Sequence, residues 1–396
     1  MSEARINSLS NENDTGGPTI SGITTFSGSN YFVPPVGTTA ERPDNSEKGS
    51  IRFNIDTKHL EYYRGDGIGW VEIEASNEEF GGLTNSAEGR GTRALWAGGY
   101  IAPGPCFNNV DAITIETLGN TMDFNNLEAS QTGGFTCSDR TRAVYAGGRT
   151  TTTPGGPNTD MIQYATFSTQ QDYADSGTNL TTASAFGSAF SDKTRGVFAG
   201  RSSPGYNKTM EYVTVQTLGE CKDFGDLHQD VGYTYAFASS TRGFVLGGLK
   251  GGSPAVSYNV IEYFTTQTTG DGTDFGDLNY TKYEGGAGSN ATRGIVAAGY
   301  GPNYTSRIEY ITMATKGNST YFGDLINLNG SGKYSAASPT RMVVGGGYIH
   351  PATPFSNVIE YVQFASTGNA SDFGDFSNFG RRANSFNNTS NGHGGL

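Results

Sequence analysis

Six evenly spaced copies of one dipeptide constrain this chain more than any other feature of its sequence. Thr-Arg recurs with 49, 53, 47, 51 and 48 residues between successive arginines, which are Arg93, Arg142, Arg195, Arg242, Arg293 and Arg341. A period of this length is typical of architectures that use one supersecondary unit repeatedly. We therefore expect six copies of one unit rather than several unrelated domains.

Each repeat carries the same series of short motifs. The arginine is followed by an apolar segment that ends in glycine, such as GFVLGG at 243–248. After a variable loop comes IEY at 261–263, 308–310 and 359–361, with IQY, MEY and VDA in the other repeats. A glycine-centred turn then leads to DFGDL at 223–227 and 274–278, or to a variant of it. The second repeat lacks this last motif and ends at 176–180.

These motifs predict two hairpins in each repeat. In the fourth repeat they pair 233–238 with 242–246, and 260–266 with 274–278. No segment has a sustained helical period, and 58 glycines with 12% aromatic residues suit tight turns between strands. Four strands in about 40–50 residues is the size of a propeller blade. The chain is therefore expected to be all-β, with residues 77–396 forming a six-bladed β-propeller of four-stranded antiparallel blades.

The two ends of the chain are expected to play different parts. We expect residues 382–396 to complete the blade begun at Arg93, because Ala383-Asn384-Ser385-Phe386 resembles the first strand of a repeat. Residues 79–83 are a poorer copy of the same strand. Residues 1–48 are polar and predict an extended attachment arm. Residues 49–76 contain three alternating runs and predict a small β-meander, which buries too little apolar surface to be stable alone.

Composition excludes several classes of partner. The formal net charge of -12 disfavours nucleic acid. The N-terminus lacks the apolar core of a signal peptide, and no apolar run approaches the roughly 18 residues that cross a bilayer, so no membrane insertion is expected. Three unevenly placed cysteines predict no disulfide framework, and the four histidines lack metal-ligand spacing. No metal or cofactor is expected.

The recurring charged residues suggest a structural role. An acid accompanies the arginine in most repeats, as Glu211, Glu262, Glu309 and Glu360, so ion pairs and hydrogen bonds within or between blades are expected to fix strand register. A sixfold ligand clamp is the alternative, because arginine binds anions well. The repetition of these residues in every unit favours the structural role, because a single ligand site would not need six copies of the same residues.

The loops between the glycine segment and the IEY strand differ in every repeat. Equivalent loops of a propeller emerge on one face, where they can vary without disturbing the core. Their aromatic residues are the predicted contact residues, namely Tyr100, Phe107, Tyr206, Tyr258, Tyr304, Tyr348 and Phe355. Alternatively, these rings only stabilise their own loops. No acid stands apart from the repeat with a partner, so no catalytic residue is predicted, and a glycan hydrolase is the enzymatic alternative.

The sequence also resembles a known group of proteins. Residues 30–73, and repeat segments such as TRGVFAG (194–200) and IEYITMATKGNSTYFGDL (308–325), resemble virion structural and fibre-like proteins of tailed phages, particularly cyanophages, with kelch-like β-propeller repeats. The resemblance implies a non-enzymatic tail fibre, adhesin or capsid appendage, located in the virion and assembled in the host bacterial cytoplasm. It further implies a trimer, attachment to other virion proteins through residues 1–75, and recognition of a host-surface glycan or protein. A purely structural virion connector and a glycan-degrading virion enzyme are the alternatives.

Overall fold

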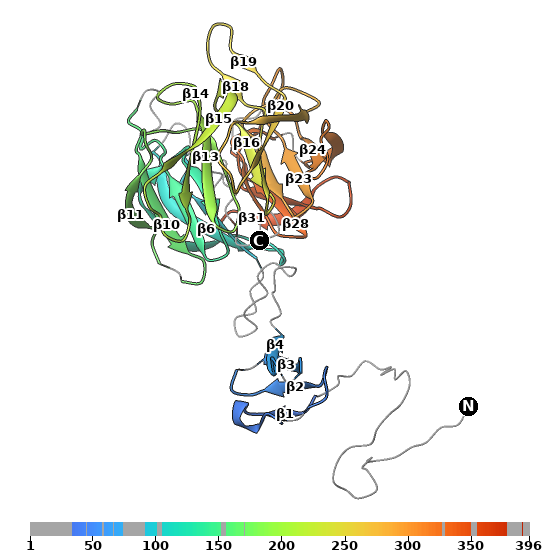
Figure 1. Cartoon of the computed structure of the whole chain (residues 1–396). Coiled ribbons are helices and arrows are strands. Elements are labelled where there is room, and N and C mark those ends of the chain that lie inside the picture. The colour runs from blue at the N-terminus through green and yellow to red at the C-terminus, as the bar shows by residue number, and fades with distance from the viewer. Residues whose placement is uncertain are drawn as a thin grey trace, which may run out of the picture. The chain divides into compact units, whose positions relative to one another are not determined.

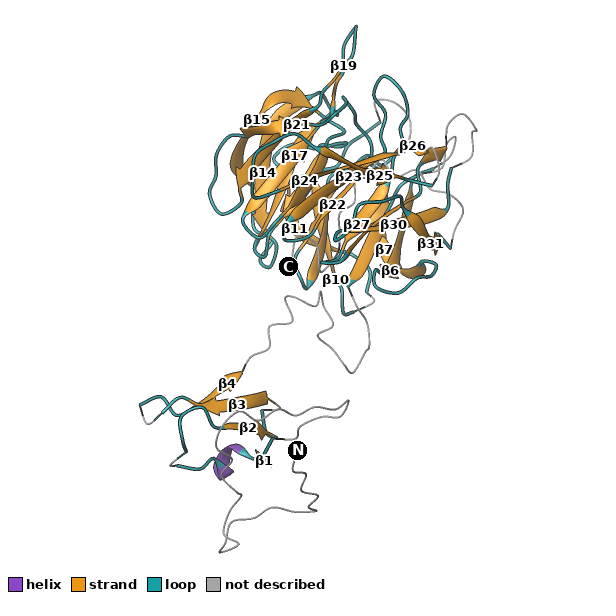
Figure 2. Cartoon of the chain, turned by 90° about the vertical axis from the view of Figure 1, so that its right-hand side faces the viewer, coloured by secondary structure: helices purple, strands orange, loops and turns teal. Residues whose placement is uncertain are grey.

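The chain divides into two compact units, Met1–Ser76 and Asn77–Leu396, which are described separately. The computed structural model describes residues 34–44, 46–57, 59–65, 67–73, 92–100, 105–151, 156–169, 171–326, 329–349, 355–377 and 390 (Figure 1). Strands make up nearly all of the regular structure (Figure 2). No helix in these ranges is long and apolar enough to cross a membrane.

The first unit contains one four-stranded sheet in the order β1-β2-β3-β4. Strands β2 (Ile51–Asn54), β3 (His59–Tyr63) and β4 (Trp70–Ile73) pair antiparallel, as the three alternating runs predicted. β1 (Val36–Gly37) adds in parallel to β2, and a 3-10 helix follows at Thr39–Glu41. The sheet therefore begins earlier than the predicted boundary at residue 49, whereas residues 1–33 of the predicted arm lie outside the described residues.

This sheet buries its polar face. Glu61 is fully buried and pairs with Arg42 at 2.5 Å and with Arg52 at 3.6 Å. Arg52 also donates to the Thr38 carbonyl, so the segment after β1 covers this side. Because side chains alternate between the faces of a strand, Ile51 and Leu60 fall on the other side, where they are 50% and 40% exposed. An apolar face is thus left open.

Over its described residues the second unit contains six sheets of three or four strands, one for each repeat, and two smaller two-stranded ladders. The first has three strands in the order β5-β6-β7, and the other five have four antiparallel strands each. The prediction of an all-β chain with four-stranded antiparallel sheets is confirmed. The second sheet is complete although its repeat lacks DFGDL, because β11 pairs with β10 along residues 174–179.

The strands of the six sheets have the following bounds: β5 Arg93–Ala97, β6 Phe107–Thr114 and β7 Met122–Gln131; β8 Phe135–Ser138, β9 Arg142–Ala146, β10 Met161–Thr166 and β11 Ala174–Asn179; β12 Ser188–Ser191, β13 Arg195–Arg201, β14 Asn207–Thr214 and β15 Lys222–Val231; β16 Tyr235–Ala238, β17 Arg242–Leu246, β20 Val260–Thr265 and β21 Thr273–Asp277; β22 Gly286–Ser289, β23 Arg293–Ala297, β24 Arg307–Thr312 and β25 Thr320–Asp324; β27 Tyr334–Ala337, β28 Arg341–Gly345, β30 Val358–Gln363 and β31 Ser371–Asp375. Two short ladders join β18 (Leu249–Lys250) to β19 (Val256–Ser257) and β26 (Asn329–Ser331) to β29 (Tyr348–Ile349).

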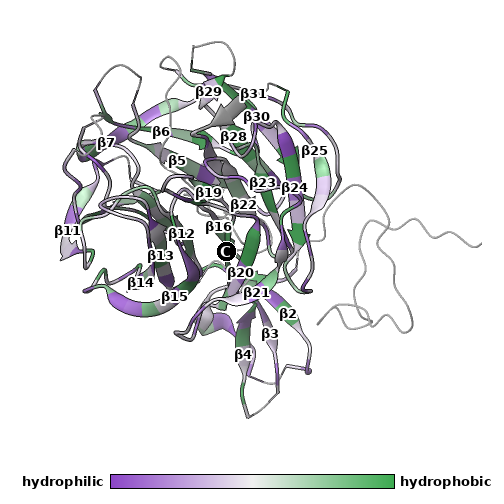
Figure 3. Ribbon diagram, turned by 90° about the horizontal axis from the view of Figure 1, so that it is seen from above, coloured by the Kyte–Doolittle hydropathy of each residue, from purple (hydrophilic) through white to green (hydrophobic). Residues whose placement is uncertain are grey.

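Burial falls from one edge of each sheet to the other. The inner strands β8, β12, β16, β22 and β27 are buried at every residue, whereas the outer strand β11 exposes four of its six residues. Seen from above, β12, β16 and β22 lie near the middle of the unit, and β11 and β25 lie at its periphery (Figure 3). The apolar core is therefore divided among the spaces between neighbouring sheets.

The recurring arginines and acids join neighbouring sheets. Each arginine is the first residue of a strand and lies 4.7–5.6 Å from the centre of an aromatic ring in its own sheet. Each also donates to a backbone carbonyl of the next sheet, and Arg341 of the last sheet donates to Glu116 of the first. Glu211, Glu262, Glu309 and Glu360 accept backbone N–H groups from the preceding sheet. Their hydrogen bonds to backbone groups therefore run between sheets.

The DFGDL motif makes a second contact between sheets. The N–H of the turn residue Gly270 donates to the Phe224 carbonyl of the preceding sheet, and Gly119 of the first sheet donates in the same way to Phe373 of the last. The glycine of the motif is needed because the chains approach closely there: a Cβ on Gly225 would lie 2.4 Å from the Gly270 carbonyl oxygen. Trp96 of the first sheet also packs on Phe376 of the last, with ring centres 5.1 Å apart.

Neighbouring sheets match large side chains with small ones. A Cβ on Gly294 of β23 would lie 2.0 Å from the ring of Phe237 in β16, and Gly243 meets Phe190 in the same way. The order is reversed at the next contact, where Gly288 of β22 faces Met342 of β28. The close packing of protein interiors leaves no space for a second large group at such a contact.

We expect Gly294→Ala to lower the free energy of unfolding by about 2–3 kcal/mol, because the added methyl group overpacks against Phe237. In a Phe237→Ala background, which has the space, the same substitution should cost less than about 1 kcal/mol. Urea denaturation of the four proteins measures both values. Equal losses in the two backgrounds would contradict this size matching.

Ser390 takes the place of an inner-strand residue on the three-stranded first sheet. It pairs with Ala94, next to Arg93, just as Ser138 pairs with Ala143 next to Arg142. Its hydroxyl donates to the Ala337 carbonyl, and its own carbonyl accepts from the Ser138 hydroxyl at 2.9 Å. One residue therefore touches three sheets. The segment predicted to complete the first blade includes Ser390, although Ser385 and Phe386 lie outside the described residues.

Candidate functional site

A turn with unusual backbone geometry precedes each of the five inner strands. The residue nine positions before each of the last five recurring arginines has a positive φ of 56–73°, and these residues are Gly133, Phe186, Tyr233, Glu284 and Gly332. Backbone N–H groups link them in series: Phe186 donates to Gly133, Tyr233 to Phe186, Glu284 to Tyr233 and Gly332 to Glu284. This left-handed region of backbone conformation is unfavourable for residues other than glycine. Three repeats nevertheless place a large side chain here, which points to a function for those side chains.

Two of these side chains begin a continuous row of rings. Phe186 and Tyr233 stack at 5.4 Å, and the row continues through Tyr283, Tyr300, Tyr304, Tyr348 and Phe355 with ring centres 4.6–6.3 Å apart. We call these seven residues the aromatic band. All but Phe186 remain partly exposed. The band therefore runs from the third to the sixth repeat and is partly exposed along most of its length.

Charged groups adjoin the band at Phe186 and at Tyr283. The Arg149 guanidinium lies 4.8 Å from the centre of the Phe186 ring. Burial, followed by the negative charge of Glu284, raises the pKa of Tyr283 and of Tyr206. The pKa of Tyr233 is raised to about 12, chiefly by burial. These phenols stay protonated at neutral pH, so each keeps a hydroxyl that can donate and accept hydrogen bonds.

The structure brings together three of the seven predicted contact residues. Tyr304, Tyr348 and Phe355 belong to the aromatic band. Tyr206 lies near Glu284, which follows the band residue Tyr283, and it packs against the backbone of Gly251, where a Cβ would lie 2.3 Å from its ring.

The other three predicted residues occupy different surroundings. Tyr258 packs against the core cluster of the third and fourth sheets. Tyr100 pairs with Cys106, and Phe107 begins β6, so both belong to the first sheet. Their role as contact residues stays a prediction.

Sequence reasoning missed four members of the band, which are Phe186, Tyr233, Tyr283 and Tyr300. The prediction considered only the variable loops, whereas Phe186, Tyr233 and Tyr283 lie directly before an inner strand. A signal was available for Phe186 and Tyr233, since alignment of the six repeats on the arginine gives Thr, Gly, Phe, Tyr, Glu and Gly at the position nine residues earlier. A large residue at a position that elsewhere requires glycine is such a signal.

Within the described ranges, no three His, Cys, Asp or Glu side chains lie close enough together to hold a metal ion. No protein-family model matches the chain, and a comparison with curated proteins found no match. The arrangement of the site therefore has to carry the functional argument. Partly exposed rings, neutral hydroxyl groups and a nearby carboxylate can all contact a bound partner.

Proposed function

We propose that this chain is a non-enzymatic structural protein of a tailed-phage particle, and that its second unit is a six-bladed β-propeller that recognises a host surface. The aromatic band carries the recognition part of the proposal. Its seven rings follow one another with centres 4.6–6.3 Å apart, and Phe186 and Tyr233 lie in turns directly before buried inner strands, so neighbouring rings and the scaffold hold them in place before a partner arrives. Preorganised aromatic side chains lose little conformational freedom on binding.

The contacts between the last and the first sheet support the closed ring. Arg341, Gly119 and Trp96 join these two sheets through the same kinds of contact that join consecutive sheets. Six units that repeat the same contact with their neighbours form either a line or a ring. Only in a ring can the sixth unit make this contact with the first unit. Ser390 adds a further link, because it contacts the first, second and sixth sheets.

The open apolar face of the first unit supports an attachment role for residues 1–75. Ile51, Leu60 and Ile73 are each 40–50% exposed and lie on neighbouring strands. A contiguous apolar patch on a soluble domain commonly marks a contact with another protein. Other virion proteins, or the further copies of a trimer, are the proposed partners.

Binding of the labelled full-length chain to marine cyanobacterial cells tests the recognition role. We expect Tyr233→Ala combined with Tyr283→Ala to weaken binding at least about tenfold, because two ring faces are lost. Leu118→Ala is the control. This side chain is 59% exposed and lies beyond the C-terminal end of β6, whereas Phe107 begins that strand. Equal binding by both variants would remove the band from the proposal.

Two alternatives predict other results in the same system. If the chain binds phage particle proteins but no cells, it is a structural connector. If it releases sugars from cell-surface polysaccharide, and one Asp or Glu substitution abolishes this release, it is a glycan-degrading enzyme. Either result would replace the proposed recognition function.

A further inference from the structure

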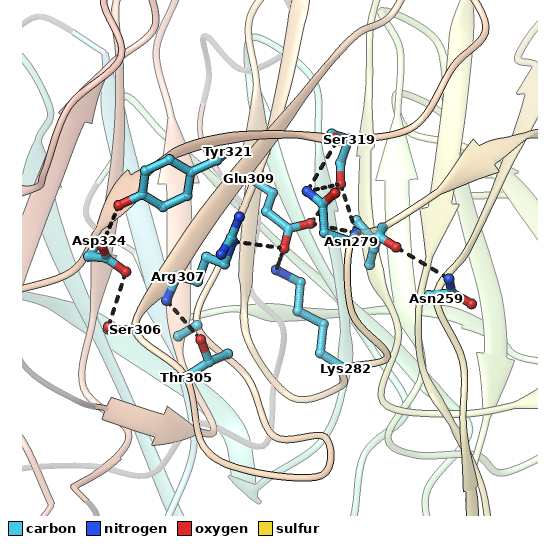
Figure 4. Close-up of polar contacts among 12 residues, drawn as sticks. Asn259, Asn279, Lys282, Thr305, Ser306, Arg307, Glu309, Ser319, Tyr321 and Asp324 are labelled. Atoms are coloured by element: carbon cyan, nitrogen blue, oxygen red, sulfur yellow. Dashed lines mark hydrogen bonds and ion pairs between the residues drawn. The ribbon is translucent and has the colours of Figure 1, made fainter.

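The fifth repeat contains a cavity that the aromatic band only borders. Its volume is about 390 Å³, within the range of small-molecule sites. It is lined by the band residue Tyr304 and by Tyr280, Lys282, Arg307, Glu309 and Asp324. Figure 4 shows Lys282 and Arg307 both directed toward Glu309. The cavity therefore places two cations and a carboxylate beside the proposed recognition surface.

The two cations depart from the repeat pattern, whereas Glu309 belongs to it. The positions equivalent to Lys282 hold Gln131, Ser184, Val231 and Gly330, and those equivalent to Arg307 hold Asn109, Met161, Thr209, Val260 and Val358. The scaffold evidently forms without a charge at either position. Features needed by the scaffold recur, so two cations confined to one repeat indicate a local function.

The polar atoms that face one another here form ion pairs but no hydrogen bonds. Lys282 is 2% exposed, and its Nζ lies 3.5 Å from Glu309 Oε1; Arg307 Nε lies 3.6 Å from the same oxygen. None of these three atoms has a hydrogen-bond partner among the described residues. The other Glu309 oxygen accepts from the Asn279 N–H and the Ser319 hydroxyl. Buried polar groups are nearly always hydrogen-bonded, so the cavity lacks an atom that can accept from two donors and donate to one acceptor.

A hydroxyl group meets this requirement, because it donates one hydrogen bond and accepts two. A carboxylate would suit the cations but its oxygens could not donate to Glu309. It would also enter a site whose formal charge is balanced, with Lys282 and Arg307 opposite Glu309 and Asp324. The Arg307 guanidinium lies 5.1 and 4.5 Å from the ring centres of Tyr280 and Tyr321, so two cation–π contacts help to orient this donor.

We propose that this cavity binds one ring of a neutral, hydroxyl-rich sugar, whose hydroxyl accepts from Lys282 and Arg307 and donates to Glu309. Tyr304 joins the cavity to the aromatic band, so the sugar is one residue of a glycan that continues along the band. This inference rests on the proposed recognition function and gives its ligand a chemical class.

Calorimetric titration of the full-length chain with glucose, galactose and mannose, and with glucuronate and inorganic phosphate as charged probes, tests the inference. We expect one neutral sugar to bind saturably with a Kd of about 1 mM. Arg307→Val and Lys282→Val install residues that other repeats carry, and each should weaken binding at least about tenfold. Lys316→Met, at an exposed lysine of the same repeat, should have no effect.

Three results would overturn the proposal. The first is that the folded chain binds no neutral sugar saturably, which would leave the cavity to water only. The second is that glucuronate or phosphate binds more tightly than every neutral sugar. The third is that both valine variants bind the sugar with unchanged affinity. The cell-binding assay separates the two hypotheses. If the chain binds cells through the aromatic band but binds no sugar in the cavity, the recognition function stands and the cavity proposal fails.

Discussion

A chain that ends at Arg381 should unfold at a markedly lower urea concentration than one that ends at Asn391. Only the longer chain keeps Ser390, which pairs with Ala94, donates to Ala337 and accepts from Ser138. Each buried hydrogen bond contributes about 1 kcal/mol, so we expect a loss of at least about 3 kcal/mol. The true loss is larger if the inner edge of β5 also becomes exposed to water.

The fluorescence of Trp96 provides a second measurement on the same two chains. This side chain is 1% exposed and lies in β5, the strand that Ser390 contacts. Its emission should shift to longer wavelength in the chain that ends at Arg381. Equal urea midpoints and equal emission in the two truncated chains would show that Ser390 does not hold the first sheet in place.

Replacing Lys333 with methionine should change how stability depends on pH. Lys333 is 1% exposed and donates to the Gly346 carbonyl at 2.6 Å. Burial lowers its pKa to about 7, against the opposing effect of Glu360, from the ordinary value of 10.5. Between these two values the unfolded chain binds more protons than the folded chain, so the free energy of unfolding rises with pH in this window. Below about pH 7 the full penalty of burying the charge is present.

The stability difference between Lys333→Met and the unsubstituted chain should therefore change by about 3 kcal/mol from about pH 7 to about pH 9.5. The methionine variant should be the more stable at the lower pH, and its advantage should shrink as the pH rises. Lys316→Met is the control, because this lysine is exposed. Parallel pH profiles for the Lys333→Met variant and the unsubstituted chain would contradict the burial of a titrating amine.

The sequence predicted the strands well where the repeat marks them. β17 begins at Arg242 and ends at Leu246, as its motif indicated. β16 begins at Tyr235 rather than at residue 233, because Tyr233 has a φ of 56° and cannot continue a strand. The apolar pattern near Tyr233 does not distinguish these conformations.

Burial in the first unit was harder to predict. The alternation of apolar and polar residues identified β2 and β3 but did not show which face of the sheet is covered. The segment that covers the polar face brings Arg42 beside Glu61, and the strand pattern alone does not report this contact. The usual expectation of an apolar buried face was therefore no guide. Charged residues that neutralise one another under a covering segment reverse this rule.

The candidate site was predicted in part. Tyr304, Tyr348 and Phe355 lie in loops whose variation drew attention to them. Lys282 and Arg307 were missed because each is an isolated charge in the sequence. Their relation depends on the pairing of β24 with its neighbours and on a turn before β22, and no linear spacing reports it.

The matching of large and small side chains limits how a gene for this chain can change. Repeat arrays commonly grow or shrink by unequal recombination, which deletes or duplicates whole units. Loss of the fifth unit would set Phe237 against Met342, two large groups, and its duplication would set Gly288 against Gly294, leaving a void. The six units are thus alike in backbone but not interchangeable, and their number and order are preserved by the side chains at their contacts.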